Sequence, residues 1–297
     1  MHEFLLEQGN DSFRIDFENY KFLVGTNFVK KYQIAFLFRN FFNKVTNSSF
    51  ALEGSLKRTC NFDDKPIEIK LWRYIEVSPN FDLETDLKMG TKSLFSKYLD
   101  SFSDVFEYNE YFNTLKTLIN SLNEEFFENE TSFEIGEKKV NLFLDEITRN
   151  IIFKQIIPLI SCNDFDCNSG DLDYEELILL QFALIDKIAS KNKDNYIFIN
   201  AEIPFLTKKI ISRIFGLKYQ NCFVLINTNS VPQCKYQDVY LCSKYLIDFS
   251  NDENIIENIM EMPFHIEKEE LLSSVQHFLD NINAQESKNK VTEELFK

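Results

Sequence analysis

Glycine and proline are scarce in this chain. Only 7 glycines and 6 prolines occur among its 297 residues, together about 4% of the chain where ordinary proteins have ~12%. No two glycines stand close enough to form the GxGxxG spacing of dinucleotide-binding loops or the GxxxxGK(S/T) spacing of P-loop NTPases. The sequence therefore excludes both of these nucleotide-binding fingerprints.

Histidine and paired cysteines are also lacking. The 3 histidines show none of the spacings of zinc motifs such as HExxH, so we expect neither a zinc site nor a histidine-based catalytic triad. The 6 cysteines contain no CxxC pair, and a chain of this length does not need disulfides. We predict reduced thiols in the core or in loops. The residues concerned are His2, His265, His277, Cys60, Cys162, Cys167, Cys222, Cys234 and Cys242.

Positive charge is in short supply. The chain has 32 Lys plus Arg against 47 Asp plus Glu, which gives a formal net charge of -15. This balance argues against a generic basic groove for nucleic acid, although it leaves room for a local basic face. No run of 18 apolar residues is present, and the first residues lack the regions of a signal peptide. We expect a cytoplasmic, globular protein without a membrane segment.

Alternating and helical patterns divide the first half of the chain. Residues 12–17 and 21–24 alternate as strands do, and a largely apolar helix is predicted over residues 29–45. Residues 50–77 form two alternating runs around the turn NFDDKP, which predicts a β-hairpin. Between residues 78 and 130 the apolar spacing is helical. These patterns indicate a mostly helical lobe inserted between strands.

A strand–helix–strand unit is the clearest pattern in the second half. Apolar residues 196–200 and 222–227 flank a helix over residues 207–215 that Gly216 closes. Two strands and a helix within about 30 residues imply a parallel crossover, and residues 245–249 add a final strand. The sequence therefore predicts an α/β sheet.

The predicted elements group into three parts. Residues 1–77 and 133–250 form an α/β core domain, and residues 78–132 form a helical domain to which residues 146–190 could also belong. Residues 251–297 form a C-terminal helical extension that ends in a polar, frayed tail. Further helices are predicted over residues 146–160, 174–190, 254–260 and 268–282.

An acidic loop is the first candidate metal site. Asp164, Asp166 and Asn168 have the spacing of positions one, three and five of a calcium-binding loop. Glu175 falls at position twelve, but Gly170 stands one place later than the glycine of that loop. The match is therefore imperfect, and acidic residues between helices can equally serve solubility.

A second acidic group surrounds a predicted helix start. Asp145 and Glu146 stand at the start of the helix, with Glu134 and Glu137 upstream. Carboxylates at a helix N-terminus also cap the helix and complement its dipole without any ligand. Metal binding and capping therefore both stay open for this group.

Basic residues form local groups despite the negative net charge. Lys209 and Arg213 stand four residues apart on the predicted crossover helix and share a face. Such groups are usually solvated surface charges, and phosphate contact requires that folding or oligomerisation gather several of them on one surface. The groups are Lys30 with Lys31, Lys138 with Lys139, Lys208 with Lys209 and Arg213, and Lys187 with Lys191 and Lys193.

The segment after the first predicted strand has the place of a phosphate-binding turn. Gly25, Thr26 and Asn27 stand there, but one glycine and no following Gly-Lys pair leave the loop without a phosphate cradle or a catalytic lysine. No nucleophile with an associated base is evident elsewhere in the sequence. We therefore expect that the protein is not an enzyme.

The predicted crossover carries a family resemblance. The segment NYIFINAEIPFLTKKIISRIFGLKYQNCFVLINTNS, followed by the strand YLIDF, resembles the C-terminal half of the CRISPR-associated Csn protein of type II-A systems, an accessory protein of spacer acquisition. Phe198, Ile199 and Asn200 match its FIN strand end. Leu206 and the following Thr and Lys match its LTK helix start.

Other segments fit the same family in the same order. Gly25 and Thr26 before an apolar helix resemble its opening, and LDEIT at residues 144–148 resembles its acidic helix start. The loop over residues 161–173 and the tail after Ser250 depart from the family and would make this chain a longer variant.

The resemblance implies a fold and a function. It implies a P-loop-ATPase-like α/β domain without a working Walker motif, an attached mostly helical domain and extra C-terminal helices. It further implies a homotetrameric ring, stabilised by calcium ions (Ca2+), that binds the ends of double-stranded DNA through basic residues lining its hole. Such a ring would act in CRISPR adaptation with the spacer integrase complex and the RNA-guided effector nuclease, and an acidic exterior can coexist with a basic hole.

Site residues follow from the resemblance by position. Glu134, Asp145 and Glu146 become calcium candidates, whereas Lys138 and Lys139 become DNA candidates. Two other functions stay open. A nucleotide-dependent enzyme of P-loop ancestry would still contact a nucleotide through the first loop, and a calcium-stabilised protein-interaction module would oligomerise without binding DNA.

Overall fold

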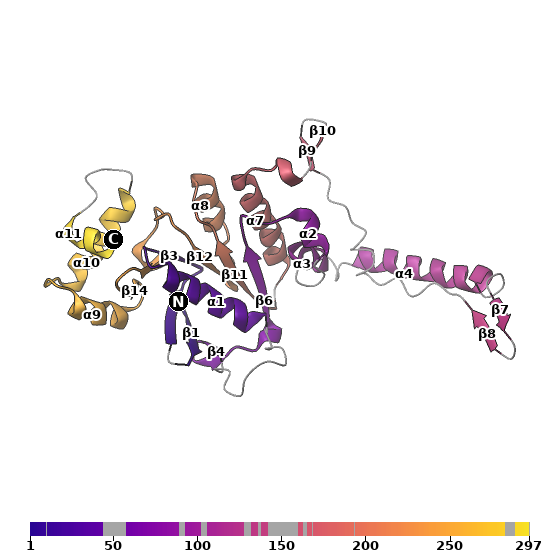
Figure 1. The fold of residues 1–297 in the computed structure, drawn as a ribbon, viewed down its shortest axis with the longest axis horizontal. Helices are drawn as coiled ribbons and strands as arrows, with labels where there is room; N and C mark the ends of the chain where they lie inside the picture. Colours follow the sequence, from indigo (N-terminus) through magenta and orange to yellow (C-terminus); the bar gives the residue numbers. More distant parts are fainter. Residues whose placement is uncertain are drawn as a thin grey trace. The chain divides into compact units, whose positions relative to one another are not determined.

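The computed structural model divides the chain into two compact units (Figure 1). The first unit comprises Met1–Asn80 and Tyr174–Lys297, and the second comprises Phe81–Asp173. The second unit therefore includes residues 133–173, which the sequence pattern places in the α/β core. The residues that the structure describes are 1–9, 11–43, 58–88, 93–101, 106–127, 132–135, 138–141, 160–162, 165–167, 169–192, 194–282 and 289–296.

A six-stranded sheet forms the centre of the first unit. Its strands lie in the order β14-β13-β3-β12-β11-β6. All neighbouring pairs are parallel except β13 and β14, which are antiparallel. The predicted α/β class and the predicted parallel crossover are thereby confirmed. The strands are β3 (Tyr20–Val24), β6 (Trp72–Val77), β11 (Tyr196–Glu202), β12 (Cys222–Asn227), β13 (Val239–Cys242) and β14 (Leu246–Asp248).

The apolar strands of this sheet are buried on both faces. Every residue of β12 from Cys222 to Ile226 has an exposed fraction of 0%, as expected for a continuous apolar run in a parallel sheet. Counted along the chain, the six strands lie in the spatial order six, five, one, four, three, two. From β3 the chain crosses to β6 at the far edge and returns through β11 to β12, next to β3. It then passes to β13 and β14 on the other side, which creates a topological switch point beside β3.

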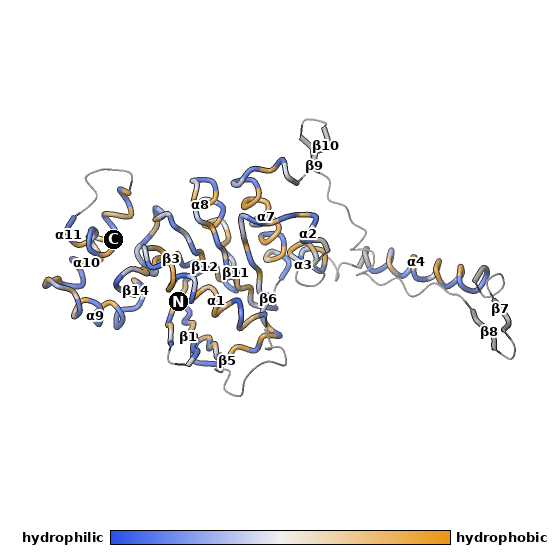
Figure 2. Tube along the Cα trace, in the orientation of Figure 1, coloured by the Kyte–Doolittle hydropathy of each residue, from blue (hydrophilic) through white to orange (hydrophobic). Residues whose placement is uncertain are grey.

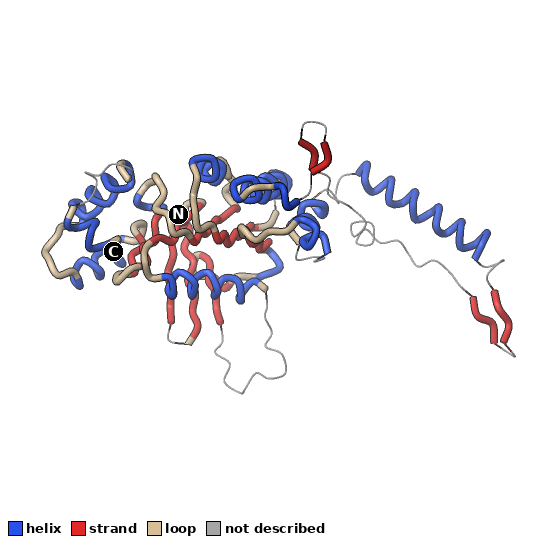
Figure 3. Tube along the Cα trace, turned by 45° about the horizontal axis from the view of Figure 1, so that its top comes forward, coloured by secondary structure: helices blue, strands red, loops and turns tan. Residues whose placement is uncertain are grey.

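Helices cover both faces of the six-stranded sheet. α1 (Phe28–Phe42) lies on one face, and α7 (Tyr174–Lys191) and α8 (Lys208–Phe215) lie on the other (Figure 3). α8 begins where the Thr207 hydroxyl accepts a hydrogen bond from the amide of Ile210 at 3.2 Å, as a Thr cap does. All three helices are predicted from the sequence.

An antiparallel sheet and an aromatic core complete this part of the first unit. The sheet has the order β2-β1-β4-β5. Phe4 of β1 is fully buried, and its ring centre lies 5.0–5.8 Å from six other aromatic rings. These rings come from both sheets and from α1, so the abundant phenylalanine joins the layers. The strands are β1 (His2–Gln8), β2 (Asp11–Phe17), β4 (Arg58–Phe62) and β5 (Lys65–Pro66), and a 3-10 turn (Ile69–Leu71) precedes β6.

The hairpin predicted over residues 50–77 is wrong in its pairing. β4 turns through Asp63 and Asp64, which have φ of 48° and 61°, into the short β5. β6 instead pairs in parallel with β11. Alternation identifies a strand but not its partner, because both pairings can bury one face. β1 and β13 are not predicted from the sequence.

Among its described residues, the second unit contains both helices and short strands, and the helical pattern predicted between residues 78 and 130 corresponds to its three α-helices. Hydrophobic and hydrophilic residues alternate along α4 (Figure 2). Asp86 accepts hydrogen bonds from the amides of Leu94 at 3.0 Å and Phe95 at 2.9 Å, which caps α3. The helix predicted over residues 146–160 lies outside the described residues, except that Ile160 belongs to β9. The elements are α2 (Leu83–Lys88), α3 (Leu94–Asp100), α4 (Phe106–Leu122), a π turn (Asn123–Phe127), β7 (Ser132–Ile135), β8 (Lys138–Asn141), β9 (Ile160–Cys162), β10 (Phe165–Cys167) and a 3-10 turn (Ser169–Asp171).

Three helices follow the six-stranded sheet: α9 (Asp252–Glu261), α10 (Lys268–Asp280) and α11 (Lys290–Leu295). The first two are predicted, but the prediction of a frayed tail is wrong for α11. Asn289 and Thr292 form a capping box, and Leu295 is fully buried. A few apolar contacts thus order a segment whose composition is mostly polar. Among the described residues, no helix is long and apolar enough to cross a membrane.

Candidate functional site at the carboxyl edge of the sheet

The loop between β3 and α1 lies at the switch point, where α/β sheets commonly bind ligands. Gly25 has φ of 104°, and a Cβ atom on it would lie 2.3 Å from the carbonyl oxygen of Cys242. The amide of Asn27 donates to the same oxygen at 2.9 Å, and the Asn27 side chain donates to the carbonyl of Ser243 at 3.2 Å. The loop is therefore bonded to the end of β13, with no space for a phosphate between the two backbones.

Lys31 also lies at this edge of the sheet, where it contacts the residues that follow β12. Its side chain is 1% exposed, and Nζ donates to the carbonyl of Thr228 at 2.7 Å and to Oδ1 of Asn229 at 3.3 Å. Nζ also lies 4.7 Å from the ring centre of Phe28. Burial lowers the pKa of Lys31. The sequence pattern treats Lys31 as a surface charge, but the structure places it inside, where it ties α1 to the end of β12.

The other basic candidates of the first unit are mostly engaged within the chain. Lys30 Nζ lies 3.1 Å from Oε1 of Gln33 and 3.5 Å from Oδ1 of Asp11. On α8, Lys209 and Arg213 pair with carboxylates of α7, at 2.6 Å from Glu175 and 2.9 Å from Asp186. Lys208 is exposed and has no polar partner among the residues that the structure describes. The three basic residues of α8 therefore do not form one free basic face.

The lysine pair of the second unit lies on a hairpin. β7 and β8 are antiparallel, and their register sets Lys139 opposite Glu134 and Lys138 opposite Ile135. The hairpin thus brings a candidate calcium ligand and the two candidate DNA contacts into adjacent strands. Sequence spacing alone does not reveal this pairing.

The remaining metal candidates are not assembled in the described part of the chain. Asp166 lies in β10, paired with Ser161 of β9. Asp145, Glu146 and Asp164 lie outside the described residues. Within the described residues, no three His, Cys, Asp or Glu side chains gather as a metal site would require. The calcium prediction therefore stays a prediction.

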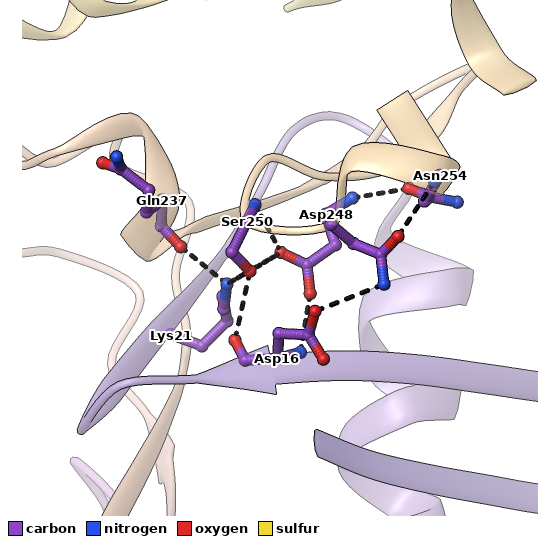
Figure 4. A network of polar contacts seen from close by, with 7 residues as sticks. Asp16, Lys21, Gln237, Asp248, Ser250 and Asn254 are labelled. Atoms are coloured by element: carbon purple, nitrogen blue, oxygen red, sulfur yellow. Dashed lines mark hydrogen bonds and ion pairs between the residues drawn. The ribbon is translucent and has the colours of Figure 1, made fainter. Parts of the chain in front are cut away.

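A buried ionic network near the C-terminal helices joins several elements of the fold (Figure 4). Lys21 Nζ donates to Oδ1 of Asp248 at 2.8 Å, to Oγ of Ser250 at 2.7 Å and to the carbonyl of Gln237 at 2.6 Å. The amide of Asp16 donates to the second oxygen of Asp248 at 2.8 Å. These partners come from β2, β3, β14 and the segment before β13. The network therefore holds β14, which leads into the C-terminal helices, against β2 and β3.

A cavity that is open to solvent lies farther along the carboxyl edge. Its walls are one face of α1 and the ends of β6, β11 and β12. The single hydrogen on Nε of Arg39 is shared between the two carboxylate oxygens of Glu76, each at 3.0 Å, and Nη2 of Arg39 donates to the same carboxylate. The cavity is not predicted from the sequence, although polar residues at the ends of apolar parallel strands can indicate such a site. The lining residues are Tyr32, Ala35, Phe36, Arg39, Glu76, Val77, Ser78, Asn200, Glu202 and Asn227.

The fold has a counterpart among solved structures. No family model and no curated protein matches the chain. The crystal structure of Stu0660 of Streptococcus thermophilus is similar, with a TM-score of 0.65, 15% identity and a match that covers 94% of this chain and 86% of that chain. At this identity the likeness concerns the fold alone.

The likeness extends into the C-terminal helices. A match over 94% of 297 residues includes about 279 residues, and the segment up to Ser250 supplies at most 250 of them. At least about 29 matched residues, 279 minus 250, therefore follow Ser250. The C-terminal helices belong in large part to the shared fold and are not an addition peculiar to this chain.

Proposed function

We propose that this protein is a non-catalytic member of the Csn family of CRISPR adaptation that binds the ends of double-stranded DNA as a calcium-stabilised homotetrameric ring. The observation that carries the proposal is the β11–α8–β12 crossover, which lies in the segment that resembles the family. The fold likeness to Stu0660 over 94% of the chain supports it. The partners we propose are the spacer integrase complex and the RNA-guided nuclease.

The loop after β3 supports the non-catalytic part of the proposal. A strand, a loop and a helix follow one another there as in a P-loop domain, and β3 is central in the sheet. The donors that would hold phosphate have other partners: Asn27 bonds Cys242, and Lys31 bonds Thr228. We infer that, in this P-loop-like domain, the groups that would bind a nucleotide instead form contacts within the chain.

The proposed DNA surface must be small on each subunit. The formal net charge of -15 repels a duplex at long range, so the contacts have to be local and repeated by symmetry. Lys138 and Lys139 are the first candidates, followed by Lys208 of α8, which is exposed and has no carboxylate partner among the described residues. Lys31 is left out because it is buried.

Calcium is proposed to hold the ring together. Glu134, Asp145 and Glu146 are the proposed ligands, and Asp164 and Asp166 form the competing site. Hard oxygen ligands of this kind suit Ca2+. We expect Asp164→Asn combined with Asp166→Asn to leave calcium-dependent tetramers intact in sedimentation experiments. If the double variant stays monomeric at saturating calcium, the ion binds the loop instead.

A gel-shift comparison tests the DNA proposal. Linear duplex and covalently closed circular duplex of the same sequence are titrated with the protein, with calcium and with a chelator. We expect a shift for the linear form in calcium and little for the circle. Equal shifts count against end binding.

The same samples separate the two alternatives. A calcium-dependent tetramer without any DNA shift favours an interaction module. Saturable heat with ATP and magnesium, together with hydrolysis, favours an enzyme of P-loop ancestry.

A further inference from the structure

The cavity between α1 and the strand ends is distinct from every contact used in the DNA proposal. It is formed entirely by the first unit, and its walls belong to α1, β6, β11 and β12. The carboxyl edge of a parallel sheet is the usual place for a ligand in this architecture. The side chains that line the cavity therefore indicate what it can bind.

Two carboxylates in the cavity, Glu76 and Glu202, share one cation, Arg39. Glu76 is neutralised by Arg39 and also accepts from the side chain of Asn43 at 3.1 Å. Glu202, at the end of β11, is exposed, and its side chain forms no hydrogen bond or ion pair with a described residue, although Arg39 attracts it electrostatically. The net charge of the cavity side chains is therefore negative.

The cavity also offers amide oxygen atoms as acceptors. The Asn200 amide nitrogen donates to the carbonyl of Ala35 at 2.9 Å and to the hydroxyl of Tyr74 at 3.0 Å. This orientation leaves its Oδ1 without a donor among the described residues. A ligand with several N–H donors and a positive charge would satisfy both this oxygen and Glu202.

Aromatic rings form the outer wall. Tyr32 and Phe36 are 60% and 37% exposed, and their rings stack at 5.5 Å with an interplanar angle of 20°. Phe28 and Val29, at 60% and 74% exposed, continue this apolar surface toward the start of α1. Ring faces attract cations, and guanidinium groups stack on them more readily than ammonium groups.

We propose that the cavity holds an arginine side chain of a partner protein, whose neighbouring apolar residues lie along the exposed face of α1. The apolar surface from Phe28 to Phe36 spans nine residues of helix, or ~12 Å, which is too long for a small amine to cover. Glu202 disfavours DNA at this position because phosphate and carboxylate repel. The acidic protein attracts basic segments at long range. This proposal does not depend on the DNA proposal.

Fluorescence anisotropy with two labelled peptides tests it on the full-length protein. Both peptides place one residue between leucines; that residue is arginine in the first and the uncharged isostere citrulline in the second. We expect the arginine peptide to bind at least tenfold more tightly than the citrulline peptide. We also expect Glu202→Gln and Tyr32→Ser each to weaken the arginine peptide tenfold or more.

Matched controls keep the result interpretable. Glu257→Gln removes the same charge from α9, outside the cavity, and should bind the peptide like the natural protein. Equal melting temperatures for all variants show that the fold is intact. Equal binding of both peptides, or no effect of Glu202→Gln, would overturn the proposal. Competition by spermidine at lower concentration than by the arginine peptide would also overturn it, since the ligand would then be a small polyamine.

Discussion

At the scale of single residues, two lysines show how burial changes the role of a charge. Lys21 is fully buried beside Asp248, and Lys31 is buried against the carbonyl of Thr228 and the side chain of Asn229. A buried ammonium is costly unless oxygen atoms surround it, and both lysines have such partners. Both therefore serve to join elements of the fold, which a count of charges in the sequence does not reveal.

Asp238 provides a pH-dependent prediction at this scale. The residue is 5% exposed, and burial raises its pKa to about 6, while Lys21 and Lys235 oppose the shift. The raised pKa means that the folded protein binds a proton between about pH 4 and 6 that the unfolded chain releases. The free energy of unfolding therefore falls as the pH rises through this window.

Asp238→Asn removes that titration. We expect the variant to gain stability relative to the natural protein as the pH rises from 4 to 7.5, by at most ~3 kcal/mol for two pKa units. Urea unfolding at both pH values measures the difference, with Glu261→Gln as an exposed control. A difference that does not change with pH would show that folding does not shift the pKa of Asp238.

A second prediction at this scale concerns Gly25, whose close contact is not evident from the sequence. Its φ of 104° and the 2.3 Å approach to Cys242 leave no place for a Cβ atom. Gly25→Ala should lower the free energy of unfolding by more than ~2 kcal/mol. Gly170→Ala is the control, because nothing lies within 4 Å of a Cβ there. Equal stability of the two variants in urea would contradict the described contact.

At the scale of elements, the strands with continuous apolar sequences were the predictable part of the fold. β12 begins and ends at the predicted residues, Cys222 and Asn227. β13, with only four residues, Val239–Cys242, is too short for periodicity to identify. The partner of β6 depends on contacts distant in sequence, which local alternation does not encode. Local patterns thus identify long elements, and tertiary contacts decide the rest.

The candidate site was less predictable than the fold. Lys30 and Lys31 are neighbours in sequence, yet only Lys31 is buried, because a helix turns adjacent residues to different sides. The cavity residues Arg39, Glu76 and Glu202 lie far apart in sequence and meet only at the sheet edge. Spacing rules find motifs within one element, whereas this cavity is built from four.

The helix α11 yields a prediction at the scale of elements. Leu295 is fully buried, and the ring centres of Phe278 and Phe296 lie 4.7 Å apart. Leu295→Ala should therefore cost about 2–3 kcal/mol of the free energy of unfolding. The exposed Glu293→Ala, in the same helix, should change it by less than ~0.5 kcal/mol. A Leu295→Ala variant as stable as the control would mean that α11 does not pack.

At the scale of the whole molecule, the negative charge and the proposed DNA binding are compatible only if a few lysines act together. Each subunit has a formal net charge of -15. In the proposed ring, a duplex would meet the same small basic surface once per subunit, while the acidic remainder would face solvent. Binding should then depend strongly on salt, because each phosphate contact releases counterions.

Charge reversal on β8 tests this dependence. Lys138→Glu combined with Lys139→Glu should weaken binding to linear duplex and flatten the dependence of the affinity on salt. Titrations over a range of salt concentrations give the slope. Lys187→Glu combined with Lys191→Glu, on α7, is the control of equal charge and should leave the slope unchanged. A slope that the β8 variant also leaves unchanged would make its lysines ordinary surface charges.

The ratio of affinities for open and closed duplex ends tests the central claim most directly. The two probes share one sequence and length, but hairpin loops close both ends of the second. Titrations in calcium at one salt concentration give the two dissociation constants. A ring that threads onto DNA ends predicts at least tenfold tighter binding to the open duplex and loss of that preference in a chelator. Equal constants for the two probes in calcium would contradict it.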